Sequence, residues 1–127
     1  MGYNIIGLED SEMIRMRLSV QSMKRGHKYK GFASWMEFVR EVKENGDYDV
    51  LLLDVELPAF NGARFIPVLR KSIPNISKIV LYSSTPYQKL KRLAEKFGAD
   101  GCISKNFSEG DAQEEHLFSE LERILQS

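Results

Sequence analysis

The chain has 127 residues, of which 43% are hydrophobic and 28% are charged, so it is long enough and apolar enough to fold as one domain over residues 1–127. Its 18 Lys and Arg residues balance its 18 Asp and Glu residues, and zero formal charge argues against a general nucleic-acid or membrane binder. The single cysteine excludes an internal disulfide, and the lack of a signal pattern or long apolar run favours a cytoplasmic protein.

Strand patterns alternate with helix patterns along the chain. The run Val50-Leu51-Leu52-Leu53 is typical of a strand buried on both faces. Ser11 and Ser34 are placed to cap helices. In chain order, we expect a strand over 3–8, a helix from 11 to about 23, a strand over 29–33, a helix from 34 to the turn at 45–47, a strand over 49–53, a loop over 58–62, a helix from 63 to about 71, a strand over 78–82, a helix over 86–98, a strand over 101–104 and a helix over about 111–125.

This order of elements predicts the fold class. Five strands that alternate with five helices, at about 30 residues per unit, indicate an α/β fold with a parallel sheet covered on both faces. Right-handed crossovers make the sheet doubly wound, and we expect the flavodoxin-like strand order 2-1-3-4-5. In such folds ligands bind beyond the carboxyl ends of the strands.

Polar side chains follow the predicted strands where such a site would lie. Glu9 and Asp10 follow the first strand, Asp54 the third, Ser83 the fourth and Lys105 the fifth. Three neighbouring carboxylates cannot all stay ionised without a compensating cation. Sites rich in carboxylate oxygens suit Mg²⁺, and Lys105 supplies a fixed positive charge. The sequence therefore predicts a Mg²⁺ site at this edge.

Four motifs at these strand ends support a more specific interpretation: LEDSEMIRMRL, LLLDVELPAFNG, IVLYSS and GADGCISKNF. In this order and spacing they resemble the response-regulator receiver domains, the CheY-like family of two-component signal transduction, over nearly the whole chain. The resemblance implies that Asp54 is the phosphoacceptor and that Glu9 and Asp10 hold Mg²⁺, with Asp54 and the backbone carbonyl of Glu56 as further ligands. It also gives Ser83 and Lys105 the family's hydroxyl and lysine positions.

The resemblance further implies a signalling switch. A histidine kinase or a phosphotransfer protein would pass a phosphoryl group to Asp54, and the surface of the helix over 86–98 and the strand over 101–104 would change for a downstream protein target. Such a chain catalyses only its own phosphorylation and dephosphorylation. We expect no direct contact with nucleic acid or membrane, a monomer or a weak phosphorylation-linked dimer, and either a stand-alone receiver or a domain excised from a longer protein.

Two positions depart from the family's pattern. Cys102 stands where an aromatic residue commonly swings between two positions, so an aromatic switch is not expected here. Asn106 follows Lys105 in place of the usual proline, and a cis peptide before a residue other than proline costs ~2.5–4 kcal/mol. Cys102 is expected to be a buried small apolar residue, and His27 and His116 are expected at the surface.

Other interpretations compete with the switch. The main alternative is a pseudo-receiver, which keeps the fold for protein binding and is not phosphorylated. Glu9 and Asp10 could serve only the dipole of the following helix, and Ser83 could simply belong to a helix-capping loop. A flavodoxin would need a phosphate-binding loop of hydroxyls and glycines where Glu9 and Asp10 stand. An independent hydrolase is disfavoured because the sequence offers no nucleophile–histidine arrangement.

Overall fold

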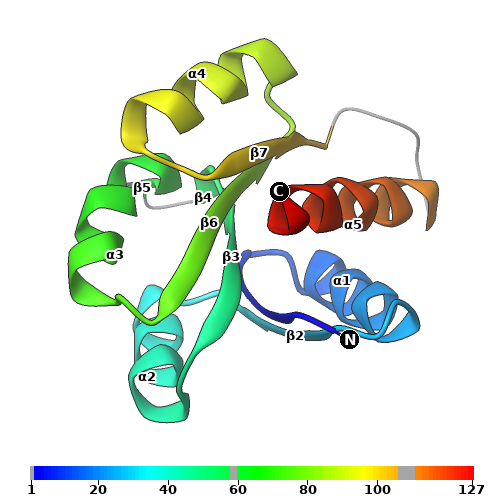
Figure 1. Cartoon of the computed structure of the whole chain (residues 1–127), viewed down its shortest axis with the longest axis horizontal. Coiled ribbons are helices and arrows are strands. Elements are labelled where there is room, and N and C mark those ends of the chain that lie inside the picture. Colours follow the sequence, from blue (N-terminus) through cyan, green and yellow to red (C-terminus); the bar gives the residue numbers. More distant parts are fainter. Residues whose placement is uncertain (1, 58–59, 106–110) are drawn as a thin grey trace.

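The computed structural model describes residues 2–57, 60–105 and 111–127, with the backbone alone for residues 56, 57, 60, 61 and 111–113. A central parallel sheet lies between two layers of helices (Figure 1). In chain order, the elements are β1 (Asn4–Leu8), α1 (Glu12–Lys24), β2 (Lys28–Phe32), α2 (Trp35–Asn45), β3 (Tyr48–Asp54), β4 (Glu56–Leu57), β5 (Phe60–Asn61), the 3₁₀ helix η1 (Gly62–Phe65), α3 (Ile66–Ser72), β6 (Ile76–Ser83), α4 (Tyr87–Phe97), β7 (Gly101–Ser104) and α5 (Asp111–Gln126).

The strand order of the main sheet is β2-β1-β3-β6-β7, and every neighbouring pair is parallel. Because β6 and β7 are its fourth and fifth strands, this is the predicted order 2-1-3-4-5, and the doubly wound α/β fold is confirmed. Helices α1 and α5 cover one face, and α2, α3 and α4 cover the other (Figure 1). Within the described ranges, no helix combines the length and the apolar character needed to cross a bilayer.

The aliphatic run in β3 is buried because the strand lies at the centre of the sheet. Leu51 and Leu53 pack into the layer that holds α2, α3 and α4, while Val50 and Leu52 pack into the layer that holds α1 and α5. All four side chains are fully buried. Successive residues of a strand point to opposite faces, so a strand covered on both sides needs apolar residues at every position.

The predicted helix caps are also present. The Ser11 hydroxyl accepts a hydrogen bond from the Ile14 amide at 3.2 Å, and the Ser34 hydroxyl accepts one from the Glu37 amide at 3.4 Å. Each bond satisfies an amide that the first turn of the helix leaves without a partner. Gly98 ends α4 in the left-handed conformation, with φ of 83°, which glycine adopts without strain.

The segment after β3 contains more structure than the expected loop. A two-stranded antiparallel hairpin, β4–β5, and the 3₁₀ helix η1 lead into α3; Pro58 lies outside the described residues. The Gly62 amide donates to the Val55 carbonyl at 3.2 Å, and a Cβ atom on Gly62 would lie 2.6 Å from the Asp54 carbonyl oxygen. Glycine therefore lets the hairpin return directly against the end of β3.

The expectation that His27 lies at the surface was wrong. His27 is 7% exposed; its Nδ1 accepts from the Tyr3 amide at 3.0 Å, and its Nε2 lies 2.7 Å from Glu122 Oε2. Arg25 binds the same carboxylate through both of its oxygens, at 2.6 and 2.9 Å. We refer to Arg25, His27 and Glu122 as the corner cluster, because they join the end of α1 to α5. His116 is exposed, as predicted.

Candidate functional site

Three acidic residues meet at the carboxyl ends of β1 and β3. These strands are paired with Leu8 opposite Leu53, so the residues that follow them are brought together. Carboxylate oxygens of Glu9, Asp10 and Asp54 all lie within 4.8 Å of one another. Glu9 and Asp54 are buried, at 1% and 3% exposed, while Asp10 is open to solvent. The strand order thus places these acids together as expected from the sequence.

Lys105 lies between two of these acids. Its Nζ is 3.4 Å from Glu9 Oε1 and 3.4 Å from Asp54 Oδ2. Its backbone amide donates to the Ser83 carbonyl at 2.6 Å, which fixes the residue directly after β7. Its single ammonium charge offsets one carboxylate charge at most. We refer to Glu9, Asp10, Asp54 and Lys105 as the rim site, and it retains surplus negative charge.

Ser83 ends β6 with its side chain fully buried. Its hydroxyl donates to Thr85 Oγ1 at 2.9 Å and accepts from the Thr85 amide at 3.1 Å. The Thr85 carbonyl in turn accepts from the Ser104 hydroxyl at 3.0 Å. The Ser83 hydroxyl is therefore part of a network that ties the loop after β6 to the end of β7.

The structure adds one residue that the sequence reasoning missed. The Tyr82 hydroxyl donates to Glu9 Oε1 at 2.5 Å, and Lys105 Nζ lies 4.3 Å from the centre of the Tyr82 ring. Burial, reinforced by the nearby Tyr29 and Glu9, raises the pKa of Tyr82 well above its usual value, so the phenol keeps its proton. The available signal was a phenol directly after the aliphatic run IVL of β6 and directly before Ser83.

The two adjacent acids have opposite pKa shifts. Burial alone would raise the pKa of Glu9, but hydrogen bonds from Tyr82 and from the Ser11 amide, together with Lys105, lower it overall. A side-chain hydrogen bond with Glu9, partial burial and repulsion by the Glu9 charge raise the pKa of Asp10. Extra positive charge at the rim site would relieve this competition between neighbouring carboxylates.

The donor set of the rim site fits a magnesium ion. Glu9, Asp10 and Asp54 offer hard oxygen ligands, and their oxygens lie close enough to share one ion. Their surplus charge supplies the attraction, and the exposure of Asp10 leaves the site open to solvent.

Three further predicted positions have different outcomes. Glu56 lies in β4, two residues after Asp54, but its side chain is outside the described set. Asn106, and with it the geometry of the Lys105–Asn106 peptide, also lies outside the described residues. Cys102 is half-buried in β7 rather than fully buried, and burial raises the pKa of its thiol, which disfavours the reactive thiolate.

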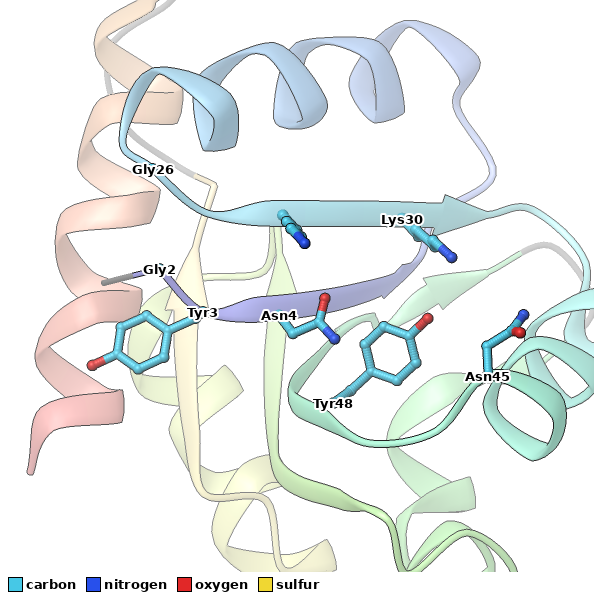
Figure 2. Close-up of a pocket in the computed structure, with 8 residues that line it drawn as sticks. Gly2, Tyr3, Asn4, Gly26, Lys30, Asn45 and Tyr48 are labelled. Atoms are coloured by element: carbon cyan, nitrogen blue, oxygen red, sulfur yellow. The ribbon is translucent and has the colours of Figure 1, made fainter.

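A hollow of about 480 Å³ lies at the opposite ends of the strands. It is lined by Gly2, Tyr3, Asn4, Gly26, Lys28, Lys30, Asn45 and Tyr48 (Figure 2). Two of its polar side chains already share one hydrogen-bond acceptor, because Lys30 and Tyr48 both donate to Glu41, at 3.0 and 2.5 Å. The charged residues of its lining are Lys28 and Lys30, and Lys30 is already paired with Glu41. The rim site is therefore the stronger candidate for chemistry.

Comparison with known protein families identifies the family of the chain. The sequence profile of the response regulator receiver domain matches residues 5–116. The chain belongs to this family. It is therefore a receiver domain of two-component signalling, as the resemblance of the four motifs implied.

Individual relatives extend the comparison. This receiver domain is 33% identical over 98 residues to the uncharacterized transcriptional regulatory protein YcbL of Bacillus subtilis, covering 77% of the chain. It is 32% identical over 108 residues to the chemotaxis protein CheY of Thermotoga maritima, covering 84% of the chain. The chain spans 40% of the length of the first relative and 88% of the second in these matches.

Solved structures show the same fold at lower sequence identity. A response regulator from Thermotoga maritima superposes with a TM-score of 0.80 at 17% identity, covering all of both chains. The chemotaxis response regulator CheY4 of Vibrio cholerae superposes with a TM-score of 0.78 at 24% identity, covering 98% of this chain and 99% of the other. Fold and family thus agree.

Proposed function

We propose that this receiver domain is a phosphorylation switch in which Asp54 accepts a phosphoryl group from a histidine kinase or a phosphotransfer protein, with Mg²⁺ as cofactor. The observation that carries the proposal is the rim site itself. A buried Asp54 carboxylate shares a cluster of oxygens with Glu9 and Asp10, and Lys105 Nζ lies 3.4 Å from its Oδ2. These are the groups that phosphoryl transfer to a carboxylate requires.

The transfer step follows from the charges of these groups. An Oδ atom of Asp54 forms a bond to phosphorus while the P–N bond to the donor histidine breaks. The electron pair of that bond returns to the imidazole nitrogen, which takes up a proton from solvent. The Lys105 ammonium stabilises the negative charge on the phosphoryl oxygens. Mg²⁺, held by Glu9, Asp10, Asp54 and the Glu56 carbonyl, would supply further positive charge for the same oxygens.

The loop after β6 connects the rim site to a second surface. A phosphoryl group on Asp54 adds acceptor oxygens that the Ser83 hydroxyl can bind in place of Thr85. Because Thr85 is bonded to Ser104, this exchange would move the end of β7. A hollow of about 300 Å³ between α4, β7 and α5 includes Cys102 and offers a place for a downstream protein target. With the small Cys102 side chain there, backbone movement rather than an aromatic swing would transmit the change.

Helix α1 presents an apolar stripe suited to the phosphodonor. Met13, Met16, Val20 and Met23 are 68%, 64%, 52% and 74% exposed, and their spacing places them on one side of the helix. The helix starts beside the rim site, because the Ser11 amide at its cap donates to Glu9. A donor histidine that reaches Asp54 brings its own protein over this end of α1, and we propose that a donor helix covers the stripe.

Charge reversal on the stripe tests this docking role. Met16→Glu should slow transfer from the cognate donor about tenfold or more, while leaving phosphorylation by a small acyl phosphate unchanged. Met36→Glu is the matched control, because Met36 is 73% exposed but lies on α2, across the sheet. If Met16→Glu and Met36→Glu slowed transfer equally, the proposal that the donor docks on the α1 stripe would be wrong.

The phosphoacceptor role is tested by incubation with Mg²⁺ and a small acyl phosphate, followed by intact mass measurement. The wild type should gain one base-labile phosphoryl group, and Asp54→Asn should gain none. Asp49→Asn, at the opposite end of β3, is the matched control and should be modified like the wild type. A wild-type chain that stays unmodified even with a competent kinase would favour the pseudo-receiver alternative. The observation that supports this alternative is Cys102, which stands where the family commonly has an aromatic residue.

A further inference from the structure

Tyr82 contacts both charges at the centre of the rim site, although nothing in the proposed transfer step uses it. Its side chain is 1% exposed and belongs to the core layer beneath α1 and α5. Its hydroxyl lies 2.5 Å from Glu9 Oε1, and the face of its ring lies 4.3 Å from Lys105 Nζ. Tyr82 thus contacts the Glu9 carboxylate through its hydroxyl and the Lys105 ammonium through the face of its ring.

The contacts of Glu9 show what the hydroxyl does. Glu9 Oε1 accepts from Tyr82, and Glu9 Oε2 accepts from the Ser11 amide at 3.0 Å. Each carboxylate oxygen therefore has a donor from the protein itself, and the carboxylate is fixed about its long axis. Ligand carboxylates held by such outer hydrogen bonds bind metals more tightly, because less order is lost on binding.

The contacts of Lys105 show what the ring does. Its Nζ makes a long hydrogen bond and ion pair, at 3.4 Å, to both Glu9 Oε1 and Asp54 Oδ2. The electron-rich face of Tyr82 attracts the ammonium from a third direction. The ring therefore limits how far Lys105 can move toward solvent, where its charge would act less on Asp54.

We propose that Tyr82 is a positioning residue of the rim site, whose hydroxyl orients Glu9 for the metal and whose ring holds Lys105 between Glu9 and Asp54. The proposal rests on the function proposed above, but it concerns Tyr82 alone. It predicts two separable effects, because Tyr82→Phe removes the hydroxyl and keeps the ring, whereas Tyr82→Leu removes both.

The test is a calorimetric titration of the full chain with Mg²⁺. It is run at a temperature at which circular dichroism shows that each variant is folded. Tyr82→Phe should weaken Mg²⁺ binding roughly tenfold. Tyr82→Leu should weaken binding by a similar factor and also slow phosphorylation by acyl phosphate, at saturating Mg²⁺, several-fold beyond Tyr82→Phe. The hydroxyl effect should disappear in the Glu9→Gln background, because a double-mutant cycle isolates the pair.

Tyr29→Phe is the matched control. The Tyr29 hydroxyl is also buried, and among the described residues it has no hydrogen-bond partner. Its removal should leave Mg²⁺ affinity within twofold of the wild type. Equal Mg²⁺ affinity for Tyr82→Phe and the wild type would overturn the role of the hydroxyl, and so would an equal loss in Tyr29→Phe.

The wild type itself supplies a second measurement that does not depend on the folding of a variant. The Tyr82 hydroxyl proton should give a slowly exchanging proton resonance that shifts along the same Mg²⁺ titration curve as the heat of binding. A resonance that stays constant through saturation would overturn the proposal. Failure of the wild type to bind Mg²⁺ or accept phosphate would instead count against the proposed function.

Discussion

The corner cluster and the rim site both bring distant charges together, but they differ in how those charges are balanced. In the corner cluster, a single Glu122 carboxylate receives Arg25 and His27 at distances of 2.6–2.9 Å. At the rim site, three carboxylates share the Lys105 ammonium, which stays 3.4 Å from two of them. The first arrangement is satisfied by the folded chain, while the second gains from an additional cation. The charges of the corner cluster therefore stabilise the fold, whereas those of the rim site favour the binding of a cation.

The largest expected effect is the loss of the ammonium from the rim site. Lys105→Met should lower the free energy of unfolding by about 3 kcal/mol without Mg²⁺, since it removes the ammonium paired with the buried Glu9 and Asp54 carboxylates. Mg²⁺ should then raise the melting temperature of Lys105→Met more than that of the wild type, because it replaces the missing charge. Thermal unfolding with and without Mg²⁺ measures both effects.

The control for this change is Lys30→Met. Lys30 pairs with Glu41 on the surface, with its side chain 57% exposed, and its loss should cost less than about 1 kcal/mol. An equal response of the two variants to Mg²⁺ would contradict the view that Lys105 compensates the rim acids.

The second largest effect belongs to the corner cluster. Glu122→Gln should lower the free energy of unfolding by about 2 kcal/mol, because Arg25 and His27 lose a charged acceptor. Mg²⁺ should stabilise this variant by the same amount as the wild type. Urea unfolding with and without Mg²⁺ provides the measurement. If Mg²⁺ restored the stability of Glu122→Gln, the corner cluster and the rim site would not differ as described.

The stability that the corner cluster provides should depend on pH in the acid range. Hydrogen bonding to Arg25, opposed by burial and supported by His27, lowers the pKa of Glu122 from 4.5 to about 2. A carboxyl group with a lowered pKa stabilises the fold above its unfolded pKa, and this stabilisation is lost as the pH falls through 4.5 toward 2. The difference in unfolding free energy between the wild type and Glu122→Gln should therefore shrink between about pH 5 and pH 2. A constant difference in urea titrations across this range would contradict the assignment.

The smallest effect should have the opposite sign. The pKa of Asp10 is raised, so its charge opposes folding at neutral pH. Asp10→Asn should stabilise the Mg²⁺-free chain by about 0.5 kcal/mol, a small value because Asp10 is exposed. The same change should weaken Mg²⁺ binding, as measured by calorimetry. A variant less stable than the wild type would show that Asp10 serves the helix α1 instead.

The parts of the molecule that could be predicted from sequence are those that depend on chain order. Strand and helix periods predicted the sheet, and the rule for strand ends placed Glu9 beside Asp54 without any side-chain coordinates. The partners of His27 and Tyr82 were not predictable in this way. Glu122 lies 95 residues from His27, and Glu9 lies 73 residues from Tyr82. Such pairs depend on the direction of single side chains, which hydrophobic patterns do not specify.

The short hairpin was missed for a related reason. Two-residue strands are too short to give a periodic signal, and Pro58 and the Asn61-Gly62 pair gave this segment the composition of a loop. The close approach of Gly62 to the Asp54 carbonyl is a backbone contact, which becomes visible only in three dimensions.

This approach of Gly62 has a consequence for engineering the chain. A side chain at position 62 would collide with the Asp54 carbonyl oxygen, so even Gly62→Ala would push the hairpin away from the residue that is to be modified. Libraries that seek altered signal lifetimes can vary the neighbouring hairpin positions, but they should hold position 62 constant. A glycine with no functional group of its own thus sets the spacing of the backbone at the reactive carboxylate.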